Sequence, residues 1–283
     1  MKSAMLEVPG GFLYYEVRGS GPVLLMIPGG PMDASGFEPV AELLADSYTV
    51  VTYDCRGNSR SPTTGPREDL TVDLAAEDAR RLLEAVGTGP AEVFGASGGA
   101  TYGLALAAHY PGLVRTLVAH EPPVTELLPD AERWRANNKR VGEIYEREGV
   151  GPALSFFVEF VFAGEPGSGP GPDVPTAEKA EPTAEEAESE ARVLRNLELF
   201  ASWLIPHIGN YEPDMAGLRA TSARIVVGVG EQSLQTHMTY QTSHALAEQL
   251  GVELAEFPGD HFVEASDPAV FAARLRGVLG AGG

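Results

Sequence analysis

The chain has 283 residues, 43% of them hydrophobic, which is enough to bury a large core as one domain with an insertion or as two smaller domains. Its 40 acidic residues against 20 Lys and Arg give a formal net charge of −20, which excludes nucleic acid and anionic membranes as expected partners, because both would be repelled. The single cysteine, Cys55, excludes an intramolecular disulfide and a multi-cysteine metal site. With no apolar leader segment and no run approaching the roughly 18 to 20 residues of a membrane span, the sequence predicts a soluble cytoplasmic protein.

Strands and helices alternate along the first part of the chain. Two runs at 12–17 and 23–27 flank a turn containing Gly and Pro and predict a β-hairpin; the second run, VLLMI, is apolar throughout, as in a strand buried on both faces. The segments expected next are a helix at 38–44, a strand at 48–52, a helix at 71–86 capped by Thr71, a strand at 91–94, a helix at 100–109 and a strand at 114–119. This alternation predicts an α/β fold with a doubly wound, mostly parallel sheet.

After Pro123 the alternation stops, and three consecutive helices are expected at 131–147, 152–162 and 184–204. The sheet pattern resumes with strands at 224–229 and 253–257 and a last helix at 268–279. We therefore expect a core formed by residues 1–122 and 221–283, with a helical cap inserted at 123–220. The cap contains a segment rich in Gly, Pro and acid near 163–183, which we expect to be a mobile loop.

The sequence VFGASGGA carries the strongest chemical signal. A predicted strand ends at Gly95, Ser97 stands between glycines, and a helix of small residues begins at Ala100. This Gly-x-Ser-x-Gly pattern allows a sharp strand-to-helix turn that exposes the serine hydroxyl above the sheet. We expect Ser97 to be a nucleophile and the N–H of Gly98, at a helix N-terminus, to donate to a developing oxyanion.

Together with three further motifs, this turn resembles the α/β-hydrolase superfamily over nearly the whole chain. IPGGPMDASGF is similar to the family's His-Gly-x-Pro loop with Pro28 in place of the histidine, and the resemblance implies that the Gly30 N–H forms the second half of an oxyanion hole. YDCRGNSRS is similar to the Tyr-Asp-x-Arg-Gly-x-Gly-x-Ser loop, and FPGDHFVEASDP to the segment that carries the catalytic histidine. The implied fold is the α/β-hydrolase fold with an inserted helical cap.

Six histidines compete for the role of general base. His261 is favoured because it follows the last predicted strand through the turn Pro258-Gly259-Asp260 and lies late in the chain, as the order serine, acid, histidine requires. The other five are interpreted as structural or solvent-facing: His109, His120, His207, His237 and His244.

The acid that should orient this histidine is missing from its usual place. Most α/β-hydrolases carry it in a Gly-x-x-Asp pattern after the strand that follows the cap, and alignment on Gly230 puts Ser233 there. Three carboxylates could substitute: Glu231, Asp260 and Glu121. We favour Glu121, in LVAHEPP, because zearalenone-type lactonases and one type of haloalkane dehalogenase place their acid after this earlier strand. Glu231 and a Ser-His dyad stay open.

These groups predict attack on a carbonyl and hydrolysis of an ester or a lactone through an acyl-enzyme. Carbon-carbon bond hydrolysis and hydroxynitrile cleavage use similar residues in relatives and stay open, as does a non-catalytic protein of this fold that binds a small ligand. A peptidase of the proline iminopeptidase type is disfavoured, because Pro28 and Met32 depart from its motif. No redox, metal or phosphate-binding motif competes, so no cofactor is expected.

The substrate is expected to be an apolar, medium-sized acyl compound or lactone. Met32 and Tyr102 stand beside the two oxyanion positions and are the first candidates for contacting it. The cap could add Trp203 and the aromatic side chains of FFVEFVF and LELFASWLIPHI, namely Phe157, Phe160 and Phe200. The sequence leaves open whether the protein forms a homodimer.

Overall fold

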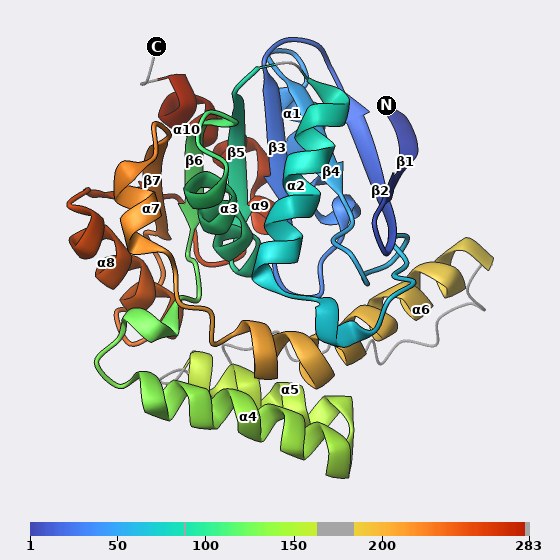
Figure 1. Ribbon diagram of the computed structural model, residues 1–283, viewed down its shortest axis with the longest axis vertical. Coiled ribbons are helices and arrows are strands. Elements are labelled where there is room, and N and C mark those ends of the chain that lie inside the picture. Colours follow the sequence, from blue (N-terminus) through green and yellow to red (C-terminus); the bar gives the residue numbers. More distant parts are fainter. Residues whose placement is uncertain (88, 163–183, 281–283) are drawn as a thin grey trace.

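Eight strands form one sheet within the described part of the chain, in the order β1-β2-β4-β3-β5-β6-β7-β8 (Figure 1). The computed structural model describes residues 1–87, 89–162 and 184–280, so the expected mobile loop at 163–183 lies outside the described residues. From β3 onwards neighbouring strands are parallel, whereas β1 and β2 run antiparallel. The strands are β1 Lys2–Val8, β2 Gly11–Arg18, β3 Val23–Ile27, β4 Thr49–Tyr53, β5 Ala91–Ala96, β6 Val114–His120, β7 Arg224–Gly230 and β8 Leu254–Phe257.

The predicted hairpin between the second and third strands is wrong. β4 lies between β2 and β3, and β2 pairs with it antiparallel, with Tyr15 opposite Tyr53. The hairpin of this sheet is formed instead by β1 and β2, which turn at Pro9-Gly10, where Gly10 has a φ of 80°. β1 escaped detection because most of its side chains are exposed, so its residues lack the alternation of apolar and polar side chains that a half-buried strand shows.

Helices cover both faces of the sheet, as a doubly wound fold requires. α2, α3 and α8 pack on one face, and α1 and α10 on the other. Within β3, Leu24 and Leu25 are both fully buried but join different cores, which confirms that VLLMI is a strand covered on both sides. The helices of the core are α1 Glu38–Leu44, α2 Val72–Val86, α3 Gly98–His109, α7 Met215–Ala220, α8 Met238–Leu250, α9 Val263–Ser266 and α10 Pro268–Gly280.

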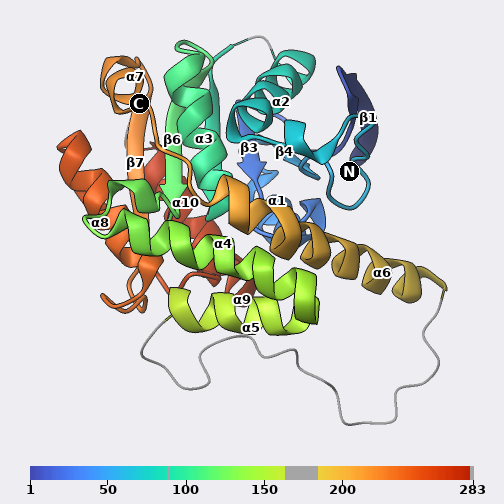
Figure 2. The same cartoon turned by 60° about the horizontal axis from the view of Figure 1, so that its bottom comes forward.

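A helical insertion covers the carboxyl ends of the strands, as predicted. It contains α4 Ala131–Glu148, α5 Val150–Val161 and α6 Ala184–Leu199, which lie together below the sheet in Figure 1 and cross in front of it in Figure 2. A third apolar core, which includes Trp134, Val141 and Ile205, holds α4 and α5 against the segment 200–208 that follows α6. The insertion thus forms a roof over the edge of the sheet at which α/β folds bind their ligands.

The last helix of the insertion departs from the prediction. The helical pattern at 184–204 continues as a π-helix, Phe200–Ile208, which contains Pro206. Proline has no N–H to donate to the backbone hydrogen bonds of a helix. The carbonyl of Pro206 accepts a hydrogen bond of 3.1 Å from the Asn210 side chain. The wider π-helical turn changes which side chains face the sheet, and Phe200 and Ile205 are among those that do. Among the described helices, none is long and apolar enough to cross a membrane.

Candidate active site

Ser97 occupies a strained turn between β5 and α3. Its φ of 51° and ψ of −121° lie outside the regions that L-residues favour. The turn is possible because its neighbours lack side chains: a Cβ at Gly95 would lie 2.5 Å from the Gly99 carbonyl oxygen, and a Cβ at Gly99 would lie 2.2 Å from the Ile27 carbonyl oxygen. The Ser97 N–H donates to the His120 carbonyl at 2.9 Å, which ties the turn to β6. The sharp strand-to-helix turn predicted at Ser97 is therefore present in the structure.

The two predicted oxyanion donors lie side by side. Gly30 has a φ of 51°, and a Cβ at Gly98 would lie 3.6 Å from the Gly30 nitrogen. Because Gly98 is the first residue of α3, its N–H has no carbonyl within the helix to bond. The fully buried Asp54 braces the loop after Gly30, since its Oδ1 accepts from the Ala34 N–H at 2.9 Å while the Arg60 side chain neutralises its charge. Sequence reasoning missed this role of Asp54.

A side chain of the cap also holds this loop. The Asn196 side-chain amide, on α6, donates 2.9 Å hydrogen bonds to the Pro31 carbonyl and to the Ser59 hydroxyl, and its oxygen accepts from the Ser59 N–H at 2.8 Å. The Ser59 hydroxyl in turn donates to Asp33 at 2.6 Å. Asn196 is only 2% exposed, so these bonds are shielded from water. A helical pattern alone gives no signal for such a contact across 137 residues.

Glu121 and His261 form a hydrogen-bonded pair. The His261 Nδ1–H donates to Glu121 Oε2 at 2.6 Å. Glu121 is fully buried at the end of β6 and has a φ of 49°, an unusual conformation for a residue with a side chain. Its carboxylate accepts three further hydrogen bonds, from the Ser233 hydroxyl at 2.5 Å, the Gly230 N–H at 2.9 Å and the Thr239 hydroxyl at 2.8 Å. Four donors therefore hold this carboxylate in one orientation.

Each member of the pair shifts the pKa of the other so that its charged form is favoured: the pKa of Glu121 is lowered and the pKa of His261 is raised. Burial alone would raise the pKa of Glu121, but the hydrogen bond and the charge of His261 lower it well below its usual value. Burial would lower the pKa of His261, and the hydrogen bond and charge of Glu121 raise it instead. The site therefore favours a carboxylate beside an imidazole that can accept a proton.

Neither rival acid contacts His261 among the described residues. Glu231 is exposed, and its backbone N–H donates to the Phe257 carbonyl. The Asp260 carboxylate accepts from the Phe262 N–H at 2.9 Å and lies on the exposed side of the loop. As expected for neighbours in sequence, Asp260 and His261 point in different directions.

Among the described residues, none of the other five histidines forms a hydrogen bond with Glu121 or His261. His120 is fully buried between Phe94 and Phe257, and burial lowers its pKa to about 4. It is therefore a neutral core residue beside Glu121, in line with its interpretation as structural. His207 stacks on Trp203, and His237 packs on Phe162.

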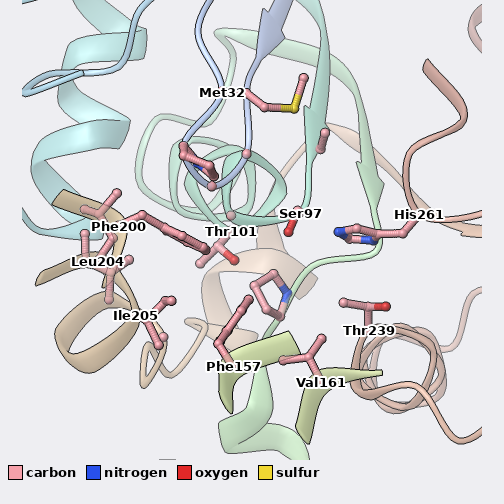
Figure 3. Close-up of a pocket in the computed structure, with 18 of the residues that line it drawn as sticks. Met32, Ser97, Thr101, Phe157, Val161, Phe200, Leu204, Ile205, Thr239 and His261 are labelled. Carbon is pink, nitrogen blue, oxygen red and sulfur yellow. The ribbon is translucent and has the colours of Figure 1, made fainter. Parts of the chain in front are cut away.

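Ser97 and His261 line one apolar cavity of about 310 Å³ between the sheet edge and the insertion. Figure 3 shows Ser97 and His261 among the residues around this cavity, with Phe157, Phe200 and Leu204 on the side of the insertion. Met32 and Tyr102, the first candidates for contacting a substrate, also line the cavity. Its size and lining suit a small, largely apolar ligand.

Trp203 does not line the cavity, contrary to expectation. Its indole N–H donates to the Leu70 carbonyl at 3.2 Å, and its ring stacks on His207 at 3.6 Å, so it joins the insertion to the core. From the π-helical turn, Leu204 lines the cavity instead, together with Phe200, which was expected there. Of the other expected aromatic residues, Phe157 lines the cavity, whereas Phe160 packs against Trp134.

Sequence comparisons agree with this architecture. A family profile of the alpha/beta hydrolase fold matches residues 22–166. The chain is 33% identical to the uncharacterized hydrolase YraK of Bacillus subtilis (strain 168) over 282 residues, which cover 99% of this chain and 96% of that protein. The chain belongs to the α/β-hydrolase fold family. The resemblance found in the motifs is thereby confirmed.

Two further matches are to a named hydrolase and to a solved esterase structure. A zearalenone hydrolase of Cladophialophora bantiana is 34% identical over 126 residues, covering 44% of this chain and 48% of that enzyme. The structure of a thermophilic esterase from Thermogutta terrifontis matches with a TM-score of 0.72 at 21% identity, covering 100% of this chain and 99% of that one. The similarity to zearalenone hydrolases is therefore distant, and the esterase structure confirms the fold.

Proposed function

We propose that this α/β-hydrolase cleaves an ester or a lactone through an acyl-enzyme, with Ser97 as nucleophile, His261 as general base and Glu121 as the acid that orients it. The observation that carries the proposal is the 2.6 Å hydrogen bond between His261 Nδ1 and Glu121 Oε2, formed beside a cavity that also contains Ser97. A buried carboxylate in this position holds one tautomer of the imidazole and stabilises the cation formed when the imidazole takes a proton.

The reaction begins with attack of Ser97 Oγ on the substrate carbonyl carbon. The hydroxyl proton passes to His261 Nε2, and the carbonyl oxygen, now negative, accepts hydrogen bonds from the N–H groups of Gly30 and Gly98. The tetrahedral intermediate then collapses, and the alcohol oxygen leaves with the proton that His261 received. Water, deprotonated by the same nitrogen, attacks the acyl-enzyme and releases the acid and free Ser97.

The lining of the cavity supports an apolar acyl or lactone substrate. Phe157, Phe200 and Leu204 offer apolar contacts to the substrate, and the volume of about 310 Å³ is within the range of small-molecule sites. The distant similarity to zearalenone hydrolases, together with an acid after β6, supports a lactone among the substrates to be tested.

The proposal is tested by hydrolysis of short p-nitrophenyl esters and of a macrocyclic lactone, with the wild type and Ser97→Ala side by side. We expect turnover by the wild type, loss of turnover in Ser97→Ala, and covalent labelling of Ser97 by a serine-directed phosphonate. A wild-type protein that neither turns over these compounds nor reacts with the phosphonate would instead be a ligand-binding member of the family.

A further inference from the structure

One buried carboxyl group in the cavity has no role in the reaction described above. Glu264, on α9, is 2% exposed and lines the same cavity as Ser97 and His261. Its Oε2 has no hydrogen-bond partner among the residues that the structure describes. A buried carboxyl oxygen without a donor costs free energy, so its retention in an apolar cavity calls for a partner that the protein itself does not supply.

The surroundings of Glu264 oppose the ionisation of its carboxyl group. Burial raises its pKa to about 7, although the hydrogen bond from its own backbone N–H and the charge of His261 act in the opposite direction. Arg and Lys side chains, which would hold a carboxylate ionised, are not among the residues lining this cavity. A group of this kind gains from a ligand that donates a hydrogen bond to it.

The position of Glu264 relative to His261 indicates which half of the substrate it meets. His261 Nε2 returns its proton to the leaving alcohol oxygen, so the alcohol half departs beside the imidazole. Glu264 lies three residues after His261, in the short helix α9. Phe162 and Phe262 pack on the His261 ring, with centroids 5.8 and 4.8 Å from it, and both line the cavity. Besides Glu264, the polar groups on this side of the cavity are His261 itself and Thr239, whose hydroxyl already donates to Glu121.

We propose that Glu264 is a specificity-determining residue that selects esters or lactones whose alcohol half carries a second hydroxyl group. The inference rests on the proposed hydrolase function and names the substrate class of that site. The hydroxyl donates to the Glu264 carboxylate while the rest of the alcohol half contacts Phe162 and Phe262. A hydroxyl fits better than an ammonium group, because burying a cation among phenyl rings with one carboxylate leaves most of its donors unsatisfied.

Three matched esters test this selection at pH 8, where Glu264 is mainly ionised: phenyl butanoate, 3-hydroxyphenyl butanoate and 3-(trimethylammonio)phenyl butanoate. We expect the wild type to prefer the hydroxyl ester to the phenyl ester by about tenfold in kcat/KM, the effect of one hydrogen bond to a charged group. The preference should shrink in Glu264→Gln and vanish in Glu264→Leu. A preference for the trimethylammonio ester, which attracts a carboxylate without donating to it, would overturn the proposal.

Thr101→Val is the matched control. Thr101 also lines the cavity, is 3% exposed and has an Oγ1 without a partner among the described residues, but it lies across Ser97 from His261 (Figure 3). Its replacement should leave the ratio between the hydroxyl and phenyl esters unchanged. Equal loss of this ratio in Thr101→Val and Glu264→Leu would contradict a specific role of Glu264.

A binding measurement separates this inference from the proposed function. The same esters are titrated into Ser97→Ala protein, with and without Glu264→Gln, so that affinity is compared without turnover. If the wild type hydrolyses phenyl butanoate through Ser97 but neither kcat/KM nor affinity depends on Glu264, the inference is wrong and the function stands. If no ester is hydrolysed and no phosphonate reacts, the function fails and the inference fails with it.

Discussion

The Ser233 hydroxyl donates a hydrogen bond of 2.5 Å to Glu121 Oε1. Ser233 stands where most α/β-hydrolases carry their acid, and here it supports a carboxylate that comes from the end of an earlier strand. The N–H of Gly230, the last residue of β7, donates to the same oxygen at 2.9 Å. Because an aspartate at 233 would repel the Glu121 carboxylate, the two placements of the acid exclude each other in this site.

Glu121→Gln is expected to lower kcat for ester hydrolysis by about 10³ to 10⁴, the cost of removing a triad carboxylate. The neutral amide can still contact the imidazole, but it cannot stabilise the cation and it allows the wrong tautomer. Glu231→Gln is the control, because that side chain is exposed and has no contact with His261. Steady-state kinetics of the two variants check the assignment. Near-normal kcat in Glu121→Gln, or an equal loss in Glu231→Gln, would refute it.

The pH dependence of kcat/KM should report the Glu121–His261 pair. His261 must be neutral to accept the Ser97 proton, so activity falls as the pH drops through the pKa of His261. Glu121 raises that pKa, so Glu121→Gln should move the acid limb of the profile to lower pH while lowering the plateau. Profiles measured from about pH 4 to 9 decide the matter. An acid limb at the same pH in both proteins would mean that another group controls it.

Much of the site could be predicted from the sequence because its residues follow the ends of predicted strands. The glycines around Ser97, the turn before His261 and the acid after a β-branched run all lie at the carboxyl ends of parallel strands, which meet at one edge of the sheet. Elements of the core were therefore predicted well, apart from β1, which was missed, and the expected hairpin, where β4 lies between β2 and β3.

The cavity lining was harder to predict. Trp203 was expected to contact substrate, but the π-helix that begins at Phe200 rotates it onto Leu70, and helical periodicity cannot anticipate such a turn. Asn196 belongs to none of the motifs, and the motif that contains Glu264 assigns a role only to His261. Both residues matter because they are buried and because the fold brings segments distant in sequence together. The local spacing of residues predicts neither burial nor such contacts.

Asn196→Ala is expected to lower kcat/KM for esters by about tenfold, because small displacements of positioned groups are costly in catalysis. The change removes the bonds from α6 to the Pro31 carbonyl and to Ser59, so the loop that carries Gly30 loses its support from the cap. As a positioning residue, Asn196 should affect kcat more than KM. Arg195→Ala, an exposed change on the same helix, is the control. Equal kinetics in both variants would contradict a positioning role.

The placement of the acid can be tested by moving it back. In the double variant Glu121→Gly, Ser233→Asp, glycine accepts the positive φ of position 121 and leaves room, while the aspartate enters the space of the removed carboxylate. The Gly230 N–H and the Thr239 hydroxyl, which now hold Glu121, remain to hold the new carboxylate beside His261 Nδ1.

We expect the double variant to exceed Glu121→Gly by at least about tenfold in kcat, since a carboxylate again stabilises the imidazolium. Ser233→Asp alone should lose activity, because two carboxylates then share one buried site and one of them must take up a proton. Glu121→Gly, Ser233→Asn provides a neutral control of similar size. The comparison is made by kcat for a p-nitrophenyl ester at neutral pH. A double variant no faster than its neutral control would show that the His261 ring cannot use an acid from the later strand.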